Sequence, residues 1–93
     1  MHVGVITLEL FIPASQSLKG KRSVIKSAKD RIANKFNVSV AEVDYTDLRQ
    51  RSLIGVAMVS NDPKIIEKTF QQIELLIEED YRVQVINSKA EFR

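Results

Sequence analysis

Alternation of apolar and polar positions opens the chain and predicts a strand. From His2 to Ile12 successive residues fall on two faces of an extended segment, and β-branched side chains favour a sheet. Pro13 ends this strand, because proline has no N–H to donate to a neighbour. Three further strands are predicted at 38–47, 53–59 and 81–92. Residues 53–59 are almost wholly apolar, which predicts a central strand buried on both faces.

Two other segments repeat their apolar residues with the period of a helix. Residues 17–36 follow a predicted N-cap at Ser17 and carry a core-facing stripe of Leu18, Ile25, Ala28, Ile32 and Phe36. Residues 62–80 begin with Asp62-Pro63, a capping carboxylate followed by proline at the first helical position. Their apolar stripe is Ile66, Thr69, Phe70, Ile73, Leu76 and Ile77.

The predicted order is therefore strand, helix, strand, strand, helix, strand. Two split βαβ units of this kind fold most simply as an α+β, ferredoxin-like βαββαβ sandwich. In that fold a four-stranded antiparallel sheet carries two helices on one face. The length of 93 residues suits a single domain over residues 1–93.

Charge is divided unequally between the two helices. Residues 18–36 hold seven Lys or Arg and one acid, Asp30, whereas residues 62–80 hold six acids and two bases. The net charge of the whole chain is only +2. A surplus of Lys, Glu, Ile and Val with no Cys hints at a thermophile. The start of the chain has no basic, cleavable apolar segment, so we expect a cytoplasmic protein.

The residue inventory argues against catalysis. There is no cysteine, and the single histidine, His2, lies at the terminus, so neither a thiol nucleophile nor an ordered Ser-His pair is expected. Asp44 and Asp47 are more consistent with a turn than with a metal site. The loop after the first strand, 13–17, has no glycine-rich phosphate cradle. We expect no enzyme activity, metal, cofactor or small-molecule substrate.

The basic helix has three interpretations. Its charges can be an ordinary solvated face, or they can meet the acidic helix of a second copy. They can also contact phosphates of RNA, free or in the small ribosomal subunit. The third interpretation assigns phosphate contacts to Lys19, Arg22, Lys26 and Lys29, with Lys21, Arg49 and Arg51 as outer candidates. A membrane partner is not expected, because the apolar side of this helix is needed for the core.

The sheet face that the helices leave uncovered is a second candidate surface. Contiguous exposed apolar residues usually mark an interface. A homodimer, or a protein partner, is predicted to use Val3, Val5, Phe11, Ile54, Val56 and Met58. The central positions of the first and third strands offer no aromatic platform for stacking RNA bases.

Several short motifs along the chain resemble those of a known family. Ser17-Leu18-Lys19-Gly20-Lys21-Arg22 is similar to the Ser-Leu-Lys-Glu-Lys-Arg motif that opens the first helix of the YlxP-like family of bacterial proteins. Similarity continues in residues 36–43, in Asp47 with Gln50-Arg51, and in residues 59–62. The resemblance implies a ferredoxin-like fold. The genes of the family often lie among those for translation initiation and ribosome maturation, which favours ribosomal RNA as the partner of the basic helix.

Two positions depart from the family pattern. Gly20 replaces a glutamate that would complete a capping box with Ser17, which is expected to weaken the first turn. Arg49 stands where relatives commonly have tryptophan in the hairpin. An arginine can stack or contact phosphate there instead.

Overall fold

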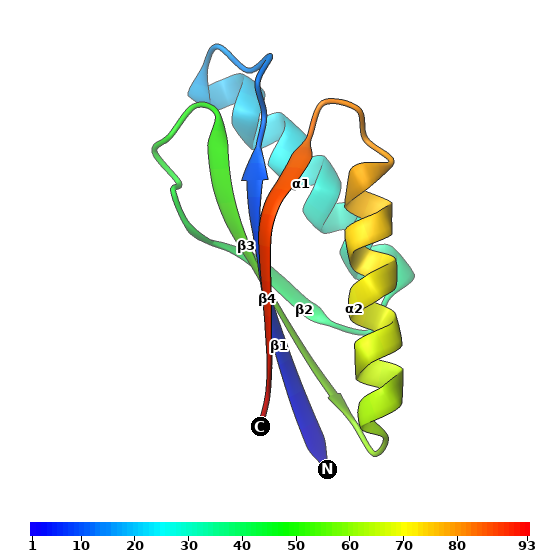
Figure 1. Cartoon of the computed structure of the whole chain (residues 1–93). Coiled ribbons are helices and arrows are strands. Elements are labelled where there is room, and N and C mark those ends of the chain that lie inside the picture. The colour runs from blue at the N-terminus through cyan, green and yellow to red at the C-terminus, as the bar shows by residue number, and fades with distance from the viewer.

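Four antiparallel strands form one open sheet, and two helices lie on one of its faces (Figure 1). The computed structural model describes residues 1–93. The order across the sheet is β2-β3-β1-β4, so the predicted ferredoxin-like arrangement is confirmed. The elements are β1 (His2–Phe11), α1 (Leu18–Lys35), β2 (Ser39–Asp44), β3 (Arg51–Ser60), α2 (Pro63–Glu78) and β4 (Gln84–Phe92).

The core lies between the sheet and the two helices. Alternation in β1 places Ile6, Leu8 and Leu10 beneath the helices, where they are almost completely buried. The stripe predicted for α2 is buried as well, apart from the half-buried Thr69. Both predicted N-caps form: Ser17 Oγ accepts from the Gly20 N–H at 3.0 Å, and an Asp62 carboxylate oxygen accepts from the Lys64 N–H at 2.9 Å.

The face assigned to β3 in the predicted interface is wrong. Ile54 pairs with Leu8 and Val56 pairs with Ile6, and residues directly opposite each other in antiparallel strands share a face. Ile54 and Val56 are therefore core residues, and Met58 packs against the same core. Of the predicted interface, Val3, Val5 and Phe11 remain on the uncovered face. On this face β3 contributes the residues that alternate with its core positions, Leu53, Gly55, Ala57 and Val59.

Helix α2 packs closely against the sheet at Gly4 of β1. A Cβ atom on Gly4 would collide with the Ile66 side chain of α2. Only a residue without a side chain lets the first turns of α2 lie so close to β1.

The two loops that matter for the site lie at one end of the sheet. The loop after β1 and the loop between β2 and β3 meet there, and both chain termini lie at the other end (Figure 1). The Ile12 N–H donates to the Gln50 carbonyl at 2.8 Å. The side-chain amide of Gln50 donates to the carbonyls of Pro13, at 3.0 Å, and Ser15, at 3.2 Å.

Neither helix combines the length and apolar character that crossing a bilayer requires.

Candidate nucleic-acid interface

Lys21, in the first turn of α1, is completely buried. Its ammonium donates to Glu42 Oε2 at 2.8 Å and to the Tyr45 carbonyl at 2.9 Å. It also approaches the carbonyls of Thr46, at 3.2 Å, and Arg51, at 3.3 Å. A charge can be buried when it is paired and its donors are used, and both conditions hold here. Lys21 thus ties the start of α1 to the loop between β2 and β3.

Glu42 completes this internal network from β2. The Glu42 side chain is 13% exposed, and its Oε2 also accepts a hydrogen bond of 2.6 Å from the Ser52 hydroxyl. Tyr45, whose carbonyl Lys21 holds, has a φ of 60°, a left-handed conformation that few residues without a small polar side chain adopt. Lys21 therefore holds the loop at Tyr45, the residue with the unfavourable left-handed backbone conformation.

The prediction that Lys21 contacts phosphate is wrong, because its ammonium is enclosed by acceptors of its own chain. The sequence did contain a signal for this. Lys21 lies three residues after Leu18 and four before Ile25, which places it inside the apolar stripe of α1. A lysine at such a position either extends to solvent or finds a buried partner, and here the partner is Glu42.

The flank of α1 that faces away from α2 keeps its cations accessible, and we call it the outer flank. It consists of Lys19, Arg22, Lys26 and Lys29, which helical geometry places on one side. Lys19 and Arg22 are exposed and form no ion pair, whereas Lys29 is half-buried. Lys26 pairs with Asp30 at 2.7 Å, and this hydrogen bond raises the pKa of the Lys26 ammonium above its ordinary value.

The opposite flank of α1 faces α2. Arg31 donates from Nη2 to the Leu76 carbonyl and to Glu79, both at 3.3 Å. This contact joins the basic helix to the acidic one within a single chain. Lys35, at the end of α1, lies 5.7 Å from the centre of the Phe36 ring. Arg31 is therefore already bound to α2 of its own chain, which leaves one cation fewer for the predicted pairing of α1 with the α2 of a second copy.

The turn after α2 holds a second local ion pair. Asp80 accepts from the Arg82 backbone N–H at 3.0 Å and pairs with its guanidinium at 2.7 Å. These hydrogen bonds from Arg82 hold the pKa of the Asp80 carboxyl below its ordinary value, and the charge of Arg31 lowers it further. This pair fixes the turn that leads into β4.

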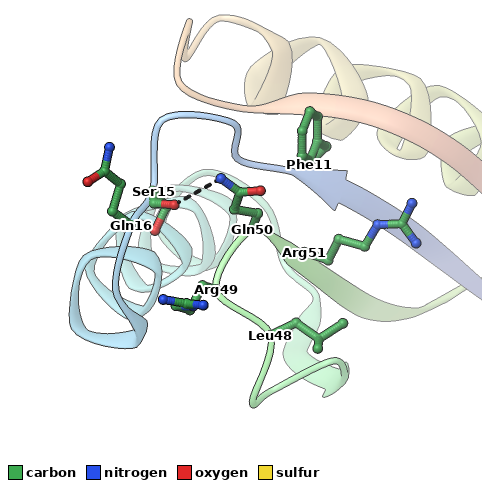
Figure 2. Close-up of a pocket in the computed structure, with 7 residues that line it drawn as sticks. All are labelled: Phe11, Ser15, Gln16, Leu48, Arg49, Gln50 and Arg51. Atoms are coloured by element: carbon green, nitrogen blue, oxygen red, sulfur yellow. Dashed lines mark hydrogen bonds between the residues drawn. The ribbon is translucent and has the colours of Figure 1, made fainter.

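Two arginines lie close together in the chain, Arg49 on the loop between β2 and β3 and Arg51 at the start of β3. Arg51 extends along the open sheet face, and its guanidinium lies 3.4 Å from a Glu9 carboxylate oxygen. Arg49 is exposed and has no acidic partner. Both line a hollow of about 590 Å³ between this loop and the loop before α1, together with Phe11 (Figure 2). We call it the loop hollow.

Of the residues predicted to contact phosphate, two form ion pairs within the chain at the surface and a third is buried. Arg51 and Lys26 have acidic neighbours, and Lys21 is buried. Lys19, Arg22, Lys29 and Arg49 form no ion pair. The Lys21 network holds the first turn of α1 and the loop carrying Arg49 at the same end of the molecule. No three histidine, aspartate or glutamate side chains lie close enough together to bind a metal ion.

Comparison with known proteins defines the family of the chain. The model described as "Protein of unknown function (DUF503)" matches residues 3–90. The uncharacterized protein YlxP of Bacillus subtilis (strain 168) is 40% identical over 76 residues, which cover 82% of this chain and 83% of YlxP.

Two solved structures share the fold. A de novo designed protein with ferredoxin fold has a TM-score of 0.54 at 14% identity and covers 100% of this chain and 83% of its own. The structural-genomics protein YJCS has a TM-score of 0.53 at 13% identity, with 96% of each chain covered. These likenesses concern the fold alone. Because the family model matches residues 3–90 of the 93-residue chain, the chain belongs to the YlxP-like DUF503 family, whose function is unknown.

Proposed function

We propose that this protein is a non-catalytic module that binds RNA, free or in the small ribosomal subunit, through the outer flank of α1. The observation that carries the proposal is the set of accessible cations without acidic partners at the start of this helix. Lys19 and Arg22 lie there in the first two turns, and Lys29 follows two turns later. Phosphates of a nucleic acid are suitable partners for such side chains.

The Lys21 network supports the same proposal. It fixes the loop between β2 and β3 against α1, so that Arg49 and the outer flank form one basic end. A surface prepared in this way binds without first ordering a loop, which reduces the entropic cost of association. Four phosphate contacts to single-stranded RNA give a slope of log K against log salt of about −3.

Cosedimentation with small ribosomal subunits, at low and at physiological salt, tests the proposal. The variant is Lys19→Glu with Arg22→Glu, two exposed residues whose replacement leaves the core intact. We expect binding by the native protein that weakens with salt, and loss of binding by the variant. Fluorescence anisotropy with a labelled single-stranded RNA gives the same comparison without the particle.

A matched control is available on the other helix. Lys64 and Lys68 of α2 are also exposed and form no ion pair. The variant Lys64→Glu with Lys68→Glu changes the net charge by the same amount, and we expect it to retain most of the affinity. Equal losses in the two variants would reduce the effect to net charge. Unchanged binding by the α1 variant would contradict the proposal.

The uncovered sheet face supports a second candidate function, association with a second copy of the chain. Val59 is 61% exposed there, beside the half-buried Val3 and Val5. The ion pairs on this face, Arg51 with Glu9 and Glu91 with both Arg93 and Lys89, offset most of its charge, which reduces the repulsion between two copies.

Sedimentation velocity tests this second candidate. Val59→Asp places a carboxylate among the apolar side chains of this face and is expected to give a monomer, whereas we expect the native protein to sediment as a dimer. Leu75→Asp is the matched control, because Leu75 is equally exposed, at 62%, but belongs to α2. A native protein that is monomeric at micromolar concentration would exclude the dimer.

A further inference from the structure

The loop hollow is lined by both an aromatic ring and a guanidinium. Phe11, at the end of β1, offers an aromatic ring that is half-buried by its surroundings. Arg49, on the facing loop, offers an exposed guanidinium without an acidic partner. Figure 2 shows these side chains on opposite walls, with Gln16 on the loop that leads into α1. The volume of about 590 Å³ is within the range of small-molecule sites.

The walls of the hollow are fixed by hydrogen bonds that leave part of its lining free. The side-chain N–H groups of Gln50 are used by the carbonyls of Pro13 and Ser15, so they brace the hollow instead of facing a ligand. The Ser15 hydroxyl donates to the Ser17 carbonyl at 3.1 Å. The Gln16 amide and the Arg49 guanidinium have no hydrogen-bond partner within the chain and remain available.

We infer that the loop hollow binds one unpaired nucleotide, with its phosphate at Arg49 and its base against the Phe11 ring. This inference rests on the proposed function, because the nucleotide belongs to an RNA that follows the outer flank of α1. Bases stack on aromatic rings whatever their identity, and an arginine can hold the neighbouring phosphate. The free amide of Gln16 can donate to or accept from a base edge.

The location of the hollow favours a nucleotide outside a duplex. Bases within an RNA helix are stacked on each other and present only their edges, so a ring in a depression cannot reach their faces. The middle of the open sheet offers no alternative platform, because Val5, Thr7 and Ala57 occupy it. Phe11 lies beyond them at the basic end, where the two loops meet.

The first test measures nucleotide binding directly by NMR. Adenosine 5′-monophosphate is added to the ¹⁵N-labelled protein at millimolar concentration, with inorganic phosphate and adenosine as separate controls. We expect saturable shifts of the Gln16, Arg49 and Gln50 amides with the nucleotide, and weaker shifts with phosphate. Shifts of the same size with phosphate alone would show an anion site without a place for the base, and would overturn the inference.

The second test places the hollow within RNA binding. Anisotropy is measured with a single strand of about 12 nucleotides and with a blunt duplex of equal phosphate number. Phe11→Leu keeps an apolar side chain at the site but removes the aromatic face. We expect it to weaken single-strand binding about tenfold, to leave duplex binding unchanged, and to be rescued by Phe11→Tyr. Arg49→Gln should lower the salt slope on the single strand by about 0.7.

The two proposals fail in different ways. If Phe11→Leu affects neither RNA while Lys19→Glu with Arg22→Glu abolishes binding of both, the loop hollow is not a nucleotide site and the outer flank remains one. If neither RNA binds but the nucleotide shifts the hollow amides, the ligand is a free nucleotide and the RNA proposal is wrong. If neither RNA binds and no amide shifts, both are wrong.

Discussion

The two sides of α1 carry similar charges and use them in opposite ways. On the inner side, Lys21 and Arg31 donate to groups of the same chain, the loop after β2 and the end of α2. On the outer flank, Lys19 and Arg22 have no partner. Both sides belong to one 18-residue helix, so its charge count does not separate structural from binding residues. The separation appears only when each cation is assigned its acceptors.

The largest expected effect comes from removing the buried cation. Lys21→Met removes the cationic partner of Glu42 and the donor to three carbonyls, and should lower the free energy of unfolding by about 3 kcal/mol. Lys19→Met, two residues earlier, should change it by less than about 0.5 kcal/mol. Urea unfolding followed by circular dichroism measures both. Equal costs at the two positions would remove the distinction between the two sides of the helix.

A smaller effect is expected where the inner side meets α2. Arg31→Ala deletes the hydrogen bond to the Leu76 carbonyl and an exposed ion pair with Glu79. We expect a loss of about 1 kcal/mol, nearly all of it from the hydrogen bond, because exposed ion pairs are screened by water. Glu79→Gln should therefore cost much less than Arg31→Ala. If the two substitutions cost the same, the ion pair is the main contribution.

Gly20 lies between the two sides and contacts neither set of partners. Gly20→Ala should stabilise the protein by about 0.5–1 kcal/mol, because alanine restricts the unfolded chain and favours the first turn of α1. The added Cβ would lie 3.1 Å from Ser17 Oγ, so the capping hydroxyl must move slightly. Destabilisation in thermal unfolding would show that this cap cannot adjust. Affinity for RNA should not change.

The smallest effect is a pH dependence at the turn after α2. The pKa of Asp80 is lowered in the folded state by Arg82, with a contribution from Arg31. Its contribution to stability is therefore present above the unfolded pKa of about 3.9, and is lost as the pH falls through the lower folded value. Urea titrations from about pH 5 to about pH 2 should show a steeper loss for the native protein than for Asp80→Asn. Parallel curves would contradict the assignment.

The fold could be predicted because most elements have an unambiguous pattern. Alternation in β1 separated its two faces, and Asp62-Pro63 marked the start of α2. The orientation of β3 could not be predicted, because residues 53–59 are apolar on both faces and only the pairing of Val56 with Ile6 determines which face is covered. When both faces of a strand are apolar, the alternation of its residues does not indicate which face is covered by the helices.

The candidate site was predicted only in part for a related reason. Lys19 and Arg22 could be recognised because the apolar stripe of α1 leaves them outside. The partners of Lys21 come from β2, the loop after it and the start of β3, more than twenty residues away in the chain, and no local sequence pattern indicates such a contact. The same holds for the loop hollow, which exists because Gln50 joins two loops.

The enclosure of the Lys21 amine also makes it a chemical reporter. Reagents that acylate amines reach Lys19 in the folded protein, whereas Lys21 becomes reactive only while the loop after β2 is detached from α1. The rate of its acylation therefore measures how often that loop opens. A ligand that bridges the loop and the helix would slow this rate at Lys21 while leaving Lys64 and Lys68, on α2, as reactive as before.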